Sequence, residues 1–435
     1  AQARAKHLPK IRAARLPEGH RDRANARDNL AKAAFANGDW AAAEGAAQET
    51  VAIRGRMLPA DHPDALLARA MLLRVQDRAG TRPSEALISE GRILLDALTL
   101  NANLARGSAQ AERQRPAYGW LAELFARRGA QEEAFRAQQW AARSSIDDAL
   151  AIAESERAAV AEPDFAAVIA QRRQLLAARQ GLEARLDANL GKPDTGFDLA
   201  GVSAQLAANR ADISRLDASL NEEQRAKLFF APSILADVMV ASPARAATVM
   251  ITDLGGPKLV TLVSDKRRAQ YVIAAEAPVG ALVARLRIGL NAGGTTAFDR
   301  VAAAELYRLL FPADAAPLLR SVERLAVIAN GSLGALPFGL LTADARGKAY
   351  LLDRMVVTRL VRAPRAAESS APAAGVGETL IALGGVESGK AGSLMAMRSA
   401  GTARAIGDLP ALPDARRELA ALAAAIGAGS AQLLI

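Results

Sequence analysis

A helix–turn–helix pattern centred on a glycine recurs three times in the first third of the chain, and it constrains the fold more than any other feature. In the first copy, residues 29–44, a helical stretch meets a Gly38-Asp39 turn and a second helix begins. Gly38 supplies the backbone freedom that this turn requires. Small residues on the facing sides predict that the two antiparallel helices pack closely: Leu30, Ala31, Ala34, Ala43 and Ala47.

The spacing of the copies predicts a repeat array over residues 1–145. Gly80 follows Gly38 by 42 residues, and the third copy turns at Gly129 after a longer connector. The second copy is looser, with Gln76 on the inner face and its small residue shifted to Ala86. Stacked pairs of this kind bury one continuous core. The third copy repeats the spacing of the first with Leu121, Ala122, Phe125, Gly129 and Ala134.

The 42-residue step and the connector Asp61-His-Pro-Asp64 resemble the kinesin-light-chain type of tetratricopeptide repeat (TPR). The resemblance implies a concave surface that binds a protein or peptide partner. His62, just before Pro63, is predicted to be a turn residue rather than a ligand. The three tryptophans are predicted to be packing residues: Trp40, Trp120 and Trp140.

Composition excludes several kinds of chemistry. The chain has no cysteine, so disulfides, thiolate metal sites and a thiol nucleophile are absent, and the redox compartment stays undecided between the cytoplasm and export. Its histidines are His7, His20 and His62 only, so the rest of the chain cannot supply a Ser-His-Asp triad or a histidine metal cluster. No catalytic, cofactor-binding or metal-ligating residue is therefore predicted.

The net charge of +9 does not by itself predict nucleic-acid binding. Arginines alternate with Gln, Glu and Asp, as at Arg172, Arg173 and Arg185, which is typical of solvated helix faces, and no aromatic platform accompanies them. Nucleic acid is thus an unlikely partner. No run approaches the roughly eighteen apolar residues of a membrane helix, so no membrane association is expected.

Residues 146–228 are predicted to form a helical hairpin that connects the repeats to the next domain. The interruption is at residues 191–196. Two readings stay open, a lever that carries movement and a passive spacer. A coiled-coil seam is expected after the interruption, at Val202, Leu206, Asn209, Ile213, Leu216 and Leu220. A less regular stripe is expected before it, at Ile169, Leu176, Leu182, Leu186 and Leu190.

From residue 229 to 435 the pattern changes to alternating strands and helices, which predicts an α/β domain with a partly parallel sheet and helices on both sides. Residues 247–253 and 259–263 flank Leu254–Lys258 and are expected to form a hairpin, to which 269–274 adds a third strand. Further strands are expected at 325–329, 355–360, 379–383 and 431–435, which are short, mostly apolar runs suited to burial on both faces. Helices are expected at 278–290, 298–311 and 414–426.

Several ordered segments of this half resemble the front of a CHAT domain, a caspase-like module that bacteria often place after TPR repeats. They are the helix Ala304–Phe311, the strand and Leu-Pro-Phe motif of Val327–Phe338, Tyr350–Asp353, and the helix start Leu412–Glu418. Leu383-Gly-Gly385 departs from the Gly-Asp-Pro that the family often has there. Each segment also has a structural explanation. Asn330-Gly331 is a turn, Leu336–Phe338 packs, and Pro413 opens a helix.

The resemblance implies a cysteine peptidase whose catalytic His and Cys segments would follow Ile435, so these 435 residues are expected to be inactive. They are interpreted as its regulatory and scaffold portion. The alternative is a non-catalytic TPR interaction module on a caspase-like platform, and a pure TPR adaptor would leave the α/β half unexplained. Gly384, Gly385 and Gly389 match no phosphate-binding pattern. The parts of 365–403 around the strand at 379–383 are expected to be surface loops.

Overall fold

A computed structural model describes residues 20–104, 109–143, 162–189, 196–230, 232–291, 298–343, 349–364, 380–383 and 431–434, together with Ile152 and Ser155. The chain divides into two compact units, residues 1–366 and 367–435. Some expectations lie outside the described residues: His7, Gly384, Gly385, Gly389, the segment Leu412–Glu418 and the helix at 414–426.

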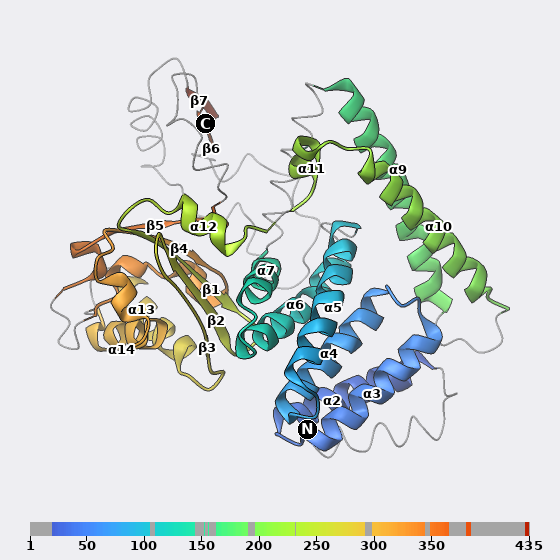
Figure 1. The fold of residues 1–435 in the computed structure, drawn as a ribbon, viewed down its shortest axis with the longest axis horizontal. Helices are drawn as coiled ribbons and strands as arrows, with labels where there is room; N and C mark the ends of the chain where they lie inside the picture. The colour runs from blue at the N-terminus through green and yellow to red at the C-terminus, as the bar shows by residue number, and fades with distance from the viewer. Residues whose placement is uncertain are drawn as a thin grey trace, which may run out of the picture. The chain divides into compact units, whose positions relative to one another are not determined.

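Three antiparallel helix pairs form the repeats (Figure 1). The turn glycines Gly38, Gly80 and Gly129 all have positive φ, at +73°, +68° and +76°. Only glycine adopts this left-handed conformation without strain, so the predicted turns are confirmed. The pairs are α2 (Arg21–Ala36) with α3 (Trp40–Met57), α4 (Pro63–Ala79) with α5 (Ser84–Leu104), and α6 (Ala109–Arg127) with α7 (Gln131–Ala142).

The looser second copy is stabilised by a polar contact with the first copy and by an aromatic side chain of the third copy. Gln76 is buried, and its Nε2 donates to Oε1 of Glu44 in the first copy at 3.1 Å. Ala86 is only half-buried, and Leu87 fills the interior instead. Phe125 of the third copy packs over Gly91 of α5, where an added Cβ would lie 2.9 Å from the ring. The copies are therefore interlocked by residue-specific contacts rather than by alanines alone.

The connector is the expected antiparallel hairpin, with α9 (Pro163–Asn189) packed on α10 (Leu199–Ala218). In α10 the predicted seam is confirmed by four buried residues, Val202, Leu206, Asn209 and Ile213. In α9 the predicted stripe is confirmed at Leu186, which is buried, whereas Ile169, Leu176 and Leu182 are only half-buried and Leu190 lies outside the described residues. The buried positions of α9 follow a seven-residue step: Phe165, Arg172, Arg179 and Leu186.

Arg172 lies inside the hairpin and not on a solvated face, which corrects the sequence-based expectation. Its Nε donates to Oδ1 of Asp217 on the far side of the hairpin at 2.9 Å, and its NH2 donates to the Asn103 carbonyl of α5 at 3.2 Å. The guanidinium also stacks over Phe229, 5.1 Å from the ring centroid. An arginine with these partners can be buried because its charge and donors are compensated.

The hairpin also docks on the turn between α3 and α4. Arg210 of α10 forms an ion pair with Asp61, and Leu58 packs against Leu186, Val202 and Leu206. The neighbouring His62 is the N-cap of α4, where its Nδ1 accepts the Asp64 backbone N–H at 3.2 Å. This confirms the predicted turn role. The connector therefore braces the repeats as well as linking them to the sheet.

The first unit contains a mixed five-stranded sheet of order β3-β2-β1-β4-β5. Strands β1, β2 and β3 are antiparallel neighbours, whereas β1, β4 and β5 are parallel, as the predicted α/β class requires. The strands are β1 (Ala246–Asp253), β2 (Lys258–Ser264), β3 (Arg268–Ile273), β4 (Arg324–Ala329) and β5 (Val356–Arg359). In the second unit β6 (Leu380–Leu383) pairs in parallel with β7 (Ala431–Leu434).

Helices cover both faces of the five-stranded sheet. Val249 and Ile251 of β1 face α13 (Val279–Asn291) and α14 (Arg300–Leu310), and Met250 faces α12 (Leu235–Ala241) (Figure 1). The second face is also covered by Phe135 of α7, the last repeat helix. The remaining elements are short: α11 (Glu222–Leu228), and the 3₁₀ turns η1 (Ala316–Leu319), η2 (Gly331–Ala335), η3 (Phe338–Leu340) and η4 (Leu351–Asp353).

The expectation that the strand at 355–360 is buried on both faces is wrong for β5. Val356 is 62% exposed, and Thr358 and Arg359 are exposed as well. The reason is position, because β5 is an edge strand of the sheet, where covering layers end. By contrast, Leu336 and Phe338 are both buried, which confirms the predicted packing role of the Leu-Pro-Phe motif.

Candidate interaction site on the repeats

Aromatic and arginine side chains lie next to one another across α2, the start of α3, α4 and α6. The guanidinium of Arg74 lies 4.4 Å from the ring centroid of Phe35 and 5.5 Å from that of Trp120. Arg78 lies 5.9 Å from the ring of Trp40. Cation–π contacts of this kind order long side chains that would otherwise be mobile. We call Phe35, Trp40, Arg74, Arg78 and Trp120 the aromatic–arginine row.

Glu123 of α6 forms ion pairs with both arginines of the row. Its carboxylate pairs with NH2 of Arg74 at 3.2 Å and with NH1 of Arg78 at 3.4 Å, and its own side chain is 6% exposed. Burial lowers the pKa of Arg74, whereas the charge of Glu123 opposes that shift. Among the residues that the structure describes, none accepts a hydrogen bond from the Nε–H of Arg74. The row thus carries positive charge in a fixed geometry.

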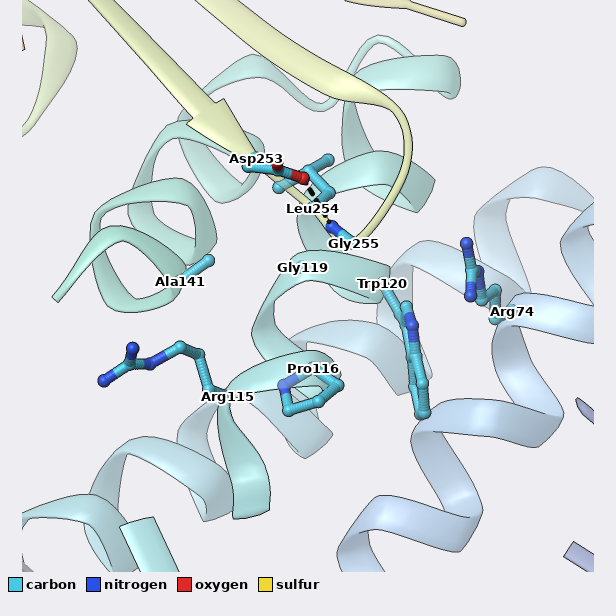
Figure 2. A pocket seen from close by; sticks show the side chains of 9 residues that line it. All are labelled: Arg74, Arg115, Pro116, Gly119, Trp120, Ala141, Asp253, Leu254 and Gly255. Atoms are coloured by element: carbon cyan, nitrogen blue, oxygen red, sulfur yellow. Dashed lines mark hydrogen bonds between the residues drawn. The ribbon is translucent and has the colours of Figure 1, made fainter. Parts of the chain in front are cut away.

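A pocket of about 440 Å³ adjoins this row where the repeats meet the sheet (Figure 2). Helices α4, α6 and α7 supply one side of it, and the β1–β2 hairpin tip supplies the other. Two arginines and Asp253 lie among mostly apolar walls, and the Asp253 carboxylate is paired with Nζ of Lys258 at 3.2 Å. The arginines make the pocket suited to an apolar group that carries negative charge. The lining residues are Arg74, Arg115, Pro116, Gly119, Trp120, Ala141, Asp253, Leu254 and Gly255.

The hairpin tip is held rigidly beside α6. Oδ1 of Asp253 accepts the Gly255 N–H at 2.9 Å, and the Asp253 N–H donates to Oδ1 of Asn330 at 2.8 Å. Leu254 is buried in the core of the repeats. Because Gly119 has no side chain, α6 approaches Leu254 so closely that an added Cβ would lie 3.4 Å from its Cα. Asn330, predicted as a turn residue, therefore also links this tip to the loop after β4.

A buried polar contact joins α7 to the sheet. Gln138 is fully buried, and its Nε2 donates to the carbonyls of Met250 at 3.1 Å and Leu259 at 2.9 Å. Its Oε1 accepts the hydroxyl of Thr261 at 2.6 Å. Sequence reasoning missed this residue, although the Gln138-Gln139 pair between apolar neighbours was a usable signal. The last repeat helix is thereby tied to the sheet by satisfied hydrogen bonds.

The histidines and tryptophans singled out from the sequence lie at helix caps and in packing contacts. His20 and His62 cap α2 and α4 through their Nδ1 atoms. Trp140 packs inside, stacked on Tyr118 at 5.5 Å, whereas Trp120 both packs and lines the pocket. In the described ranges no group of His, Asp and Glu could hold a metal ion. Within the same ranges no helix has the length and apolarity to cross a membrane.

Two segments of the chain match known protein families. A tetratricopeptide repeat is matched at residues 23–64, over α2, α3 and the start of α4. A CHAT domain is matched at residues 300–435, from α14 through β7. No curated protein and no solved structure matches the chain. A tetratricopeptide repeat followed by a CHAT domain gives this protein the TPR–CHAT architecture.

Proposed function

We propose that this chain is the regulatory and scaffold portion of a bacterial TPR–CHAT cysteine peptidase. Its repeats bind a protein or peptide partner on their concave surface, and the binding event reaches the sheet. Repeat arrays interact with proteins, and the CHAT domain belongs to the caspase-like peptidases. We propose the domain division 1–145 for the repeats, 146–228 for the connector and 229–435 for the CHAT portion.

One observation carries the proposal: the tip of the β1–β2 hairpin forms a wall of the pocket beside the aromatic–arginine row. A peptide that occupies the row contacts Trp120 and Leu254 together. Leu254 is directly connected to the sheet, because the preceding residue, Asp253, is the last residue of β1, and its N–H donates to Asn330 just after β4. Binding on the repeats is therefore expected to change the mobility of the hairpin before any larger movement.

Peptide hydrolysis needs groups that these residues do not contain. A thiolate nucleophile requires a base within hydrogen-bond distance, yet the sequence has no cysteine and no histidine after His62. The nucleophile and the base would thus come from outside the 435 residues. A gene sequence that continues past Ile435 with a strand-His-Gly and a Ser-Ala-Cys segment would support the peptidase. A continuation without them would leave a non-catalytic interaction protein.

The binding half of the proposal is tested by selecting random linear peptides on phage against the 435-residue chain. An enriched peptide is then titrated while amide hydrogen exchange is followed. We expect slower exchange in the β1–β2 hairpin, because the ligand covers its tip, and an affinity that falls roughly tenfold in Arg115→Ala if the peptide carries a carboxylate.

Arg113→Ala is the matched control, since Arg113 is exposed on the same helix and does not line the pocket. The proposal fails if no peptide is enriched. It also fails if a bound peptide leaves hairpin exchange unchanged and binds both variants equally well.

A further inference from the structure

A second cleft lies at the amino-terminal ends of the parallel strands β4 and β5, whereas the pocket beside the aromatic–arginine row lies at the carboxyl end of β1. The second cleft has a volume of about 530 Å³ and is formed by the end of α14, by η1 and by the residues just before β5. It shares no residue with the pocket beside the aromatic–arginine row. The side chains that define its chemistry are Tyr307, Arg308, Phe311, Arg320, Arg354 and Met355.

The three arginines give this cleft an uncompensated positive charge. Among the described residues, no Asp or Glu lines it. Nε of Arg308 donates to the Ala304 carbonyl of its own helix, at 3.2 Å. Within the described part of the chain, no carboxylate pairs with Arg308, Arg320 or Arg354, and all three are exposed. Nearby arginines differ in this respect, since Arg245 pairs with Glu323 at 2.6 Å.

The cleft has an apolar floor beneath these charges. Tyr307, Phe311 and Met355 are all buried, and the two aromatic rings lie 5.1 Å apart. Burial raises the pKa of the Tyr307 hydroxyl, and the charge of Arg354 opposes that rise. The Arg354 guanidinium therefore interacts electrostatically with a residue on the floor of the cleft. Three cations over a low-dielectric floor attract an anion more strongly than the same charges would in open solvent.

We propose that this cleft binds a multiply phosphorylated small molecule. Guanidinium forks match the oxygens of phosphate groups, and three of them offer more donors than a single carboxylate can accept. The volume is that of a small-molecule site. Two sources supply this chemistry, a nucleotide and an inorganic polyphosphate. The bound anion would tie α14, η1 and the start of β5 together, independently of any peptide on the repeats.

Isothermal titration calorimetry of the 435-residue chain with tripolyphosphate and with ATP tests the proposal at moderate salt. We expect both probes to bind, and Arg320→Gln and Arg354→Gln each to weaken binding about tenfold, because each removes a charge-assisted contact. Arg287→Gln is the matched control, since Arg287 is an exposed arginine of α13 outside the cleft. The control variant is expected to bind both probes as the parent chain does.

The two probes also separate the two sources. Tighter binding of ATP would assign the floor of the cleft to a nucleoside group, whereas equal affinities would assign the site to the phosphate chain alone. Both results support the proposal. It is overturned if neither probe binds at millimolar concentration, or if Arg287→Gln weakens binding as much as the cleft variants do, since net charge alone would then be responsible.

Discussion

His62 shows how much one residue depends on its surroundings. Burial lowers its pKa below the ordinary value of 6.5. The carboxylates of Asp64, Asp187 and Asp61 oppose that shift, and the charge of Arg54 adds to it. Asp187 belongs to α9, so the imidazole at the cap of α4 faces the docked hairpin, with Nε2 4.0 Å from Oδ1 of that residue. Protonation would thus place a buried charge where the connector meets the repeats.

The pH dependence of stability follows from this shift. The unfolded chain takes up the proton at a higher pH than the folded one, so the contribution of neutral His62 is complete above pH 6.5 and decreases as the pH falls below it. His62→Asn keeps an oxygen that caps the helix and removes the titration. Urea unfolding at pH 7.5 and pH 5.5 should show a larger loss for the parent chain, by at most about 1.4 kcal/mol per pH unit. An equal loss of unfolding free energy in the parent chain and in His62→Asn would contradict the assignment of this pH dependence to His62.

At the scale of elements, the helix pairs fit through particular contacts and not through general apolarity. Gly91→Ala should destabilise the chain by roughly 1–3 kcal/mol, because the new methyl group would lie 2.9 Å from the ring of Phe125. Gly45→Ala in α3 is the control, since nothing lies within 4 Å there, and it should stabilise by roughly 0.5–1 kcal/mol. Urea midpoints measure both effects.

The interpretation of the Gly91 contact depends on relief by a second change. Gly91→Ala with Phe125→Leu should lose less stability than the sum of the single variants, because the smaller side chain makes room for the methyl group. Two independent, additive losses, or a Gly91→Ala variant as benign as Gly45→Ala, would show that α5 and α6 adjust freely.

The positions of most elements could be predicted from local pattern, whereas the burial of their residues could be predicted only in part. The glycine turns, β1–β4 and the seam of α10 follow from signals that lie within a few residues of one another. Arg172 was misjudged because its partners, Asp217 and the Asn103 carbonyl, are far away in sequence. Val356 was misjudged because an apolar run does not reveal whether a strand is at an edge. α12 was missed, since seven residues carry little periodicity.

At the scale of the molecule, the last repeat helix, α7, packs directly on one face of the sheet, which the sequence did not indicate. Gln138 of α7 binds backbone carbonyls more than a hundred residues away, and no local pattern reports such a pairing. The pocket beside the row was equally hidden, because Trp120 and Leu254 meet only after folding. What the order of motifs did predict was the architecture, since each part carries its own signature.

Gln138→Leu tests whether this packing of α7 on the sheet makes the two parts one cooperative unit. The change removes the acceptor of the Thr261 O–H, whose oxygen still accepts from Gln270, and it removes the donor to the Met250 and Leu259 carbonyls, at a cost of roughly 1–3 kcal/mol. We expect the parent chain to unfold the repeats and the sheet together, and the variant to unfold them in two steps, as measured by hydrogen exchange of α2–α5 and β1–β2 during denaturation. Gln48→Leu, on the exposed side of α3, is the control. A single step in both variants would mean that other contacts hold the repeats and the sheet together.

The absence of a side chain at Gly119 has a consequence for modularity. The helix surface that carries this glycine is shaped for the Leu254 tip of this particular sheet. A repeat array grafted from another protein would have to bring an equally small residue to that position, or it would lift the hairpin away. The repeats are therefore not freely interchangeable between proteins. A chimera that replaces the repeat array must also keep a small residue at the position of Gly119, where α6 contacts Leu254.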